Sequence, residues 1–227
     1  MIGHVHGAPP APTPPASTPP AGPTAGKLIQ TLGGLGAVAG LVIVVAYTAT
    51  LPRIEANKAR VLAAAVDEVL GAPARYDTLY VTGDSLARTR PTDGDPASLE
   101  TVYLGYRADS SIIGFAVTGA DPGFADVVRL IFGYDPRESR VLAMKVLEEK
   151  ETPGLGDKIE KDTLFVAEFR NAIAPLRGVK RGEGNDSTEI DMITGVTISS
   201  RTVIRVINQT LERLGPVLAA HLQGAPQ

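Results

Sequence analysis

The sequence predicts an α+β fold, in which a single N-terminal transmembrane helix precedes a domain with a mainly antiparallel sheet and packed helices. Residues 28–51 are 24 consecutive positions without a charged side chain, which is long enough for a helix to cross a bilayer. Four stretches within residues 101–149 are rich in β-branched and aromatic residues and are separated by turn residues, as short strands are. Residues 199–222 then repeat apolar side chains at helical spacing.

The composition of the 227-residue chain excludes several classes of function. The net charge is −3, so we expect no nucleic-acid partner. Cysteine is absent, which excludes disulfides, iron–sulfur clusters and cysteine-ligated zinc. Two of the three histidines, His4 and His6, lie near the N-terminus, and we therefore expect no metal centre.

Residues 1–27 are expected to form a disordered tail, because eight prolines and no charged side chain occur in residues 1–26. The apolar segment 28–51 follows, and we interpret it as a transmembrane helix. A secretory signal peptide is the alternative, because the segment lies near the N-terminus and contains small residues. The apolar run is longer than the roughly 7–15 residues of a signal-peptide core, and its cationic start is weak.

The charges that flank this segment favour a cytoplasmic C-terminal domain. Only Lys27 precedes the segment, whereas Arg53, Lys58 and Arg60 follow it, and positive residues accumulate on the cytoplasmic side of membranes. Because three charges against one is a small bias, the orientation depends on the motifs further along the chain.

The rest of the chain divides into a connecting helix over residues 52–72 and a domain over residues 73–220. Gly71 and Pro73 end the connecting helix. We predict a loop over residues 88–98, followed by four strands that begin at Thr101, Ser111, Val127 and Arg140. A helix over 161–173 and a short strand and turn over 187–195 come next. A closing helix over 199–222 completes the domain, and Gly215 and Pro216 could interrupt it.

The stretch DMITGVTISS, residues 191–200, places several hydroxyl groups at the start of the closing helix. Ser199 or the serine after it is a suitable N-cap. Capping leaves Thr194, Gly195 and Thr197 unexplained. A glycine flanked by threonines before a helix also favours a phosphate, because free backbone N–H groups and the positive end of the helix dipole lie there. Both interpretations stay open on these residues alone.

A second unusual stretch, ETPGLGDKI, occupies residues 151–159. One proline and two glycines within four residues predict a tight loop after a strand. Leu155 lies between the glycines and would be presented at the tip of the loop. An ordinary strand-to-helix turn does not require a leucine there, whereas a planar aromatic ligand could rest on it.

The motif ETPGLG, followed about forty residues later by DMITGVTIS, resembles the FMN-binding domain family, whose second motif is D-x-x-[ST]-G-A-[ST]-x-[ST]. Within that family the pair resembles the G subunit of the Rnf ion-translocating electron-transport complex. The C subunit of the Na⁺-translocating NADH:quinone oxidoreductase contains a related domain. The resemblance extends over nearly all of the chain after residue 27, and the two motifs in this order are specific as a pair.

The resemblance implies that FMN is joined through its phosphate to the hydroxyl of Thr197. In that family a separate flavin transferase installs the group, with FAD as donor and magnesium present. Thr194 and Gly195 belong to the same motif. Asp191 occupies its first position, where a carboxylate could help to position the hydroxyl or the metal; a strand-end aspartate in a turn is the alternative interpretation.

The resemblance also assigns the first motif to the isoalloxazine ring. Thr152 and Leu155 are expected to contact the ring, while Glu151, Gly154 and Gly156 shape the loop that lets the ring approach. No residue is expected to be catalytic, because the cofactor carries out the electron chemistry.

Two positions and one turn depart from the family pattern. Val196 stands where alanine is usual, and its extra methyl groups could slow recognition by the transferase. Glu149 stands where a histidine often precedes the first motif. The turn DPGFAD, residues 121–126, replaces a glycine-rich turn that contains tyrosine.

These expectations describe a membrane-anchored flavoprotein subunit that relays electrons within an Rnf-type complex. Its partners would be the other membrane and iron–sulfur subunits, which must move the ion because the lone span contains no charged residue. The family places this domain on the periplasmic side of the bacterial inner membrane, against the charge count. Two alternatives are a stand-alone anchored FMN carrier for another extracytoplasmic reductase and a flavin-free docking subunit, which Val196 and Glu149 would favour.

Overall fold

A computed structural model of the protein describes residues 24–91 and 99–224. The predicted tail before residue 24 and most of the predicted 88–98 loop lie outside these ranges. The chain divides into two compact units, Met1–Ile54 and Glu55–Gln227.

The helix α1, Ala25–Val69, contains the whole predicted transmembrane segment. Its side chains from residue 25 to residue 50 are all exposed. Within the described ranges it is the one helix long and apolar enough to cross a membrane, so it fits a single-pass anchor. The helix continues through Pro52 into the predicted connecting helix, although an interior proline removes one backbone hydrogen bond and crowds the preceding turn.

The second unit is built on a seven-stranded antiparallel sheet in the order β2-β1-β3-β4-β5-β6-β7. The predicted α+β class with a mainly antiparallel sheet is confirmed, and all four predicted strands form. Two strands at the sheet edge, β1 and β2, are not expected from the sequence. The strands span Arg75–Thr82 (β1), Ser85–Ala87 (β2), Thr101–Tyr106 (β3), Ile112–Pro122 (β4), Val127–Asp135 (β5), Arg140–Glu148 (β6) and Ala172–Ile173 (β7).

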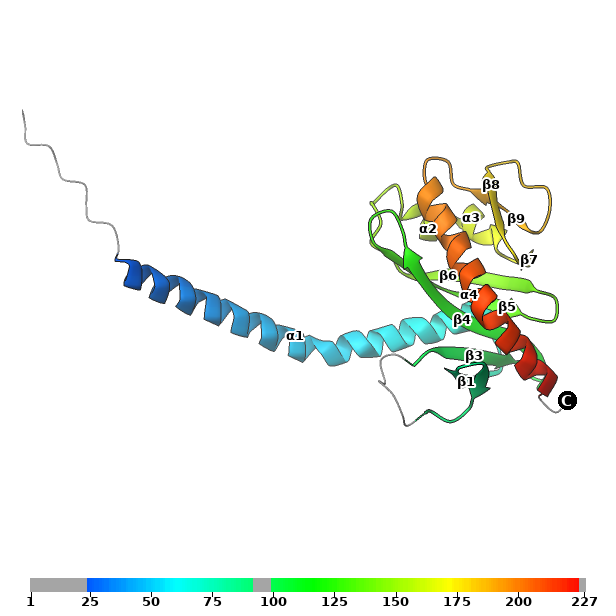
Figure 1. The fold of residues 1–227 in the computed structure, drawn as a ribbon, viewed down its shortest axis with the longest axis horizontal. Helices are drawn as coiled ribbons and strands as arrows, with labels where there is room; N and C mark the ends of the chain where they lie inside the picture. The colour runs from blue at the N-terminus through cyan, green and yellow to red at the C-terminus, as the bar shows by residue number, and fades with distance from the viewer. Residues whose placement is uncertain (1–23, 92–98, 225–227) are drawn as a thin grey trace, which may run out of the picture. The chain divides into compact units, whose positions relative to one another are not determined.

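Alternating side chains give this sheet two apolar faces. In β5, Leu130 and Phe132 join the larger core cluster, whereas Ile131 joins a smaller cluster on the other face, as the two-residue period of a strand requires. The helix α4, Thr197–Gly224, packs on the first face and crosses the strands in Figure 1. The last turns of α1 cover the second face through Val66 and its neighbours.

The predicted helix over residues 161–173 is wrong in its extent. Two short helices, α2 (Lys158–Lys161) and α3 (Thr163–Glu168), stand in this region, and its last two residues form strand β7 beside β6. Asn171 takes the left-handed conformation, with φ 61°. A residue in that conformation cannot continue a right-handed helix, and asparagine tolerates it better than most residues do.

The closing helix differs from the prediction at its start. It begins at Thr197 and runs without interruption through Pro216, because buried Leu214 and Leu218 anchor the turns on both sides. Ser199 therefore lies inside the first turn, and its expected role as N-cap is wrong. A short parallel pair, β8 (Arg177–Lys180) and β9 (Glu189–Met192), precedes this helix.

Candidate functional site

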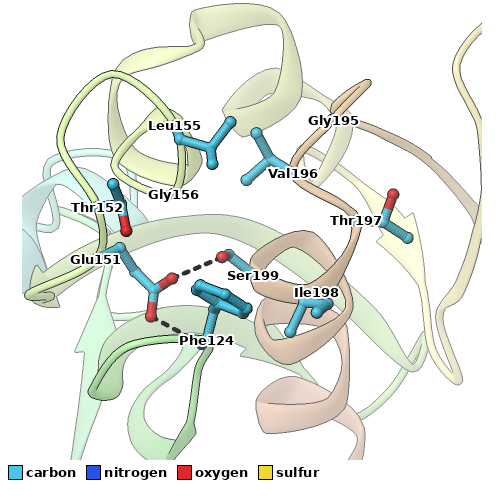
Figure 2. Close-up of a pocket in the computed structure, with 10 residues that line it drawn as sticks. All are labelled: Phe124, Glu151, Thr152, Leu155, Gly156, Gly195, Val196, Thr197, Ile198 and Ser199. Atoms are coloured by element: carbon cyan, nitrogen blue, oxygen red, sulfur yellow. Dashed lines mark hydrogen bonds between the residues drawn. The ribbon is translucent and has the colours of Figure 1, made fainter.

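A pocket of about 310 Å³ opens where three segments of the second unit meet. One segment is the loop after β6, the second is the β4–β5 turn, and the third is the start of α4. Figure 2 shows the side chains around it. The lining residues are Phe124, Glu151, Thr152, Leu155, Gly156, Gly195, Val196, Thr197, Ile198 and Ser199.

The loop after β6 is held by its own backbone. The N–H groups of Leu155 and Gly156 both donate to the carbonyl oxygen of Thr152, over 3.1 and 3.0 Å. Gly154 sits at φ +76°, a conformation that favours glycine. Leu155 remains 45% exposed and lies across the pocket from Val196 (Figure 2). The local hydrogen bonds and Gly154 thus shape this loop so that the side chain of Leu155 faces the pocket.

A tight turn leads into α4 on the opposite wall. The N–H of Val196 donates to the carbonyl of Ile193 over 3.0 Å, and Gly195 takes φ +81° between them. Thr197 is the first residue of α4 and lies half-buried at the pocket edge. The first N–H groups of a helix have no partner inside it, and they carry a partial positive charge. This wall therefore offers a hydroxyl group at a place that suits an anion.

Glu151 joins the three segments. Its side chain is buried, with 5% exposed. One carboxylate oxygen accepts hydrogen bonds from the N–H groups of Phe124 and Ala125, over 2.9 and 3.1 Å, and the other accepts from the hydroxyl of Ser199 over 2.8 Å. The dashed lines in Figure 2 mark contacts of this carboxylate. Three donors facing one carboxylate match the acceptor-only character of its ionised form.

Two glycines make room for this carboxylate. A Cβ atom on Gly123 would overlap Oε1 of Glu151, and a Cβ atom on Gly156 would lie 2.6 Å from Oε2. Both positions are closer than real contacts allow, so a side chain at either glycine would displace the carboxylate. The two glycines therefore belong to the same local structure as Glu151.

The structure brings six of the nine predicted site residues together at this pocket. Thr194 is exposed on the turn before α4, Gly154 lies on the loop outside the lining, and Asp191 lies elsewhere. The six that meet are Glu151, Thr152, Leu155, Gly156, Gly195 and Thr197.

Asp191 lines a different hollow, together with Glu168. Its carboxylate accepts hydrogen bonds from the N–H groups of Gly182 and Gly184, over 2.7 and 3.0 Å. These contacts fasten the connection between β8 and β9. Burial raises the pKa of Glu168, and the negative charge of Asp191 adds to that effect.

Three lining residues are not identified from the sequence. Phe124 and Ile198 are large apolar side chains that remain 64% and 53% exposed, and the sequence pattern assigns Ser199 to a cap. Phe124 has a recognisable signal, because an aromatic residue in a turn between two predicted strands has no core to enter. Ile198 and Ser199 have none, since their place depends on where α4 begins.

The chemical character of the pocket follows from this lining. Phe124, Leu155 and Ile198 provide an apolar rim, while a single ionisable side chain, Glu151, stands among the ten lining residues. Within residues 24–91 and 99–224 no group of three or more potential metal ligands occurs. The pocket can hold a flat apolar ring, and the edge at Thr197 can hold an anionic group.

Comparisons with known proteins agree with this arrangement. Residues 123–212 match the FMN-binding domain family. This range begins at the β4–β5 turn and ends within α4, so it contains every residue that lines the pocket.

Three relatives carry the names of subunits of ion-translocating oxidoreductase complexes. The chain is 26% identical to the G subunit of the ion-translocating oxidoreductase complex of Methanosarcina acetivorans, over 82% of this chain and 92% of that one. It is also 26% identical to the G subunit of the Na⁺-translocating ferredoxin:NAD⁺ oxidoreductase complex of Acetobacterium woodii, over 82% and 89%. Identity rises to 33% with the G subunit of the ion-translocating oxidoreductase complex of Shewanella amazonensis, over 48% of this chain and 52% of that one.

Two solved structures share the fold. NqrC from Shewanella oneidensis matches with a TM-score of 0.60 and 15% identity, over 73% of this chain and 99% of that one. The C subunit of the Na⁺-translocating NADH-quinone reductase from Parabacteroides distasonis matches with a TM-score of 0.52 and 18% identity, over 66% and 78%.

Proposed function

From the FMN-binding domain that the chain carries over residues 123–212, we propose that it is the G-type subunit of an Rnf-like ion-translocating oxidoreductase. In this role it is anchored by α1 and carries FMN, attached covalently through the phosphate to Thr197. It relays electrons between other subunits of the complex, which include membrane and iron–sulfur proteins.

The observation that carries the proposal is the meeting of two distant motifs in one pocket. Thr152 and Leu155 come from the first motif, and Gly195 and Thr197 come from the second. A loop that presents an apolar side chain thus lies beside a hydroxyl at a helix N-terminus. A flavin nucleotide needs both features, because its ring is flat and largely apolar while its phosphate is anionic.

The residues present fit FMN. The exposed faces of Phe124, Leu155 and Ile198 would cover the isoalloxazine ring and exclude water from it. The first backbone N–H groups of α4 would offset the negative charge of a phosphate on Thr197. FMN itself supplies the capacity to accept and release electrons.

Attachment of the cofactor requires a second enzyme. A flavin transferase would present FAD to Thr197, whose Oγ forms a bond to the phosphorus of the FMN half. The pyrophosphate bond breaks, AMP leaves, and the hydroxyl proton is released. Thr197 is suited to this step because it is only half-buried at the pocket edge and can enter another active site.

The test is the intact mass and in-gel flavin fluorescence of the full chain coexpressed with a flavin transferase. We expect a mass gain of one FMN less one water, which Thr197→Ala abolishes and Thr197→Ser retains. Thr163→Ala is the matched control, because Thr163 is likewise the first residue of a helix but is exposed outside the motif and does not line the pocket. Absence of any gain, with the transferase active on a known substrate, would reject covalent attachment and favour the flavin-free docking subunit or a noncovalent FMN binder.

The proposed location of the second unit is the periplasmic side of the inner membrane. The basis is the resemblance to the G subunit of Rnf, and the count of flanking charges opposes it, with Lys27 before the segment and Arg53, Lys58 and Arg60 after it. Fusion of reporters to the C-terminus tests this point. Activity of a cytoplasmic reporter combined with inactive alkaline phosphatase would reverse the orientation.

A further inference from the structure

We propose that Glu151 is a positioning residue whose buried negative charge lowers the reduction potential of the flavin in the pocket. The proposal rests on the proposed function, because it takes the occupant to be FMN. It assigns the carboxylate two linked effects: the carboxylate holds the pocket walls together, and it opposes negative charge on the bound ring.

Glu151 places a charge in the pocket lining, while the carboxylate of Glu149 lies outside the lining and accepts from the backbone N–H of Glu151 over 2.6 Å. Glu151 is the one ionisable side chain among the ten lining residues, and only 5% of it is exposed. Its neighbours in the lining are mostly apolar. Because a fixed charge acts more strongly where water is excluded, this buried carboxylate would act more strongly on an occupant of the pocket than an exposed charge outside the lining does.

The carboxylate cannot easily turn away from this place. The N–H groups of Phe124 and Ala125 hold one oxygen, and the hydroxyl of Ser199 holds the other. The glycines at positions 123 and 156 leave no spare room around it, since a Cβ atom at either would overlap a carboxylate oxygen. The charge is therefore fixed relative to the pocket.

The charge of the flavin ring changes on reduction. FMN held here would gain two electrons and one proton on full reduction, so its ring would carry a negative charge that the oxidised ring lacks. A fixed negative charge nearby makes the anionic form less favourable and leaves the neutral form almost unaffected. The ratio of reduced to oxidised flavin at a given ambient potential is therefore smaller than it would be without the charge.

The decisive variant is Glu151→Gln, which removes the charge and can keep the three contacts. The amide oxygen can still accept from the backbone N–H groups of Phe124 and Ala125, while the amide nitrogen can donate to the hydroxyl of Ser199. Glu160→Gln is the matched control, because Glu160 is exposed on α2 and does not line the pocket. Glu151→Asp retains the charge but is too short for all three contacts.

The measurement is the midpoint potential of the flavin in the detergent-solubilised full chain, titrated with dithionite against a reference dye. For Glu151→Gln we expect a more positive midpoint, with the reduced-to-oxidised ratio at fixed potential raised roughly tenfold. An effective dielectric of about 20 gives a factor of this order for unit charges about 10 Å apart. Glu160→Gln should leave the midpoint unchanged, and Glu151→Asp should give no positive shift.

Each result has one meaning. A midpoint of Glu151→Gln equal to that of the wild type overturns the proposal, as does an equal positive shift in Glu151→Asp, which would indicate a structural effect alone. If Glu151→Gln does not fold, Thr152→Lys is compared with Thr152→Met, because both enlarge the side chain and only the lysine offsets the charge of Glu151; equal midpoints in the two variants overturn the proposal. Failure of the wild type to gain flavin mass would reject the proposed function itself, and the mass spectrum separates that case from the others.

Discussion

The carboxylate of Glu151 accepts a hydrogen bond from the hydroxyl of Ser199 over 2.8 Å, although the two residues are 48 positions apart in the chain. Both side chains are buried. The contact joins the loop after β6 to the first turn of α4, and these are the two segments that contain the motifs. The wall of the pocket therefore depends on a pair of polar residues that pack against each other inside the protein.

Ser199→Ala is expected to lower the free energy of unfolding by about 1.5–3 kcal/mol, because it removes a hydrogen bond to a charged group and leaves a buried carboxylate oxygen without that donor. Urea unfolding of the detergent-solubilised chain, followed by circular dichroism, measures the change. Ser187→Ala is the matched control, since Ser187 is exposed and its replacement should change the stability by less than about 0.5 kcal/mol. Equal stabilities for the two variants would contradict a structural role for this contact.

The parts of the site that can be predicted from sequence are those that local chemistry determines. Proline and glycine around Leu155 specify a tight loop, and Gly195 specifies a turn before a helix, whatever the rest of the chain does. The four central strands are predictable for a similar reason, because their β-branched residues and intervening turns are local signals.

The remaining features depend on contacts between distant segments. Nothing near Glu151 in the sequence indicates that Ser199 would bind it, because both residue types are common on protein surfaces. The sequence pattern places the start of α4 too late, since a buried serine and a capping serine look alike in a sequence. The sequence pattern also predicts a helix that continues to residue 173, beyond the end of α3. The reason is that Asn171 carries only a weak signal for the left-handed conformation that ends the helical region.

Gly156→Ala and Gly154→Ala should have different consequences, although both glycines lie in one loop. A Cβ atom at position 156 would overlap Glu151, which should displace the carboxylate and lower the stability by about 1–3 kcal/mol. Position 154 has open space around it but a φ of +76°, so alanine there costs about 1–2 kcal/mol through backbone strain alone.

Flavin loading distinguishes these two mechanisms. In coexpression with the transferase, Gly156→Ala should reduce the ratio of flavin to protein, because it disturbs the pocket wall at Glu151. Gly154→Ala should retain that ratio, because its strain lies outside the lining. The steric explanation fails if Gly156→Ala loads flavin as well as the wild type does.

The ion pair between Asp157 and Lys161 at α2 should make the stability depend on pH in the acid range. The side chain of Asp157 is only 8% exposed, and the ammonium group of Lys161 lies 2.7 Å from its carboxylate. The hydrogen bond from Lys161 holds the pKa of Asp157 below its ordinary value of 3.8, and the backbone N–H of Gly154 contributes in the same direction. Because the pKa is lower in the folded state, the unfolded state binds more protons in this range.

The sign of the effect follows from that difference. The stabilisation is fully present above the unfolded-state pKa near 3.8 and is lost as the pH falls through the folded-state pKa. Lys161→Met should therefore lower the free energy of unfolding at pH 7. When urea unfolding is repeated at decreasing pH, the free energies of unfolding of the variant and the wild type should become equal at the most acid pH. Lys158→Met is the control, because Lys158 contributes less to the pKa of Asp157. A constant gap between wild type and Lys161→Met at every pH would assign the loss to packing of the lysine side chain instead of to its charge.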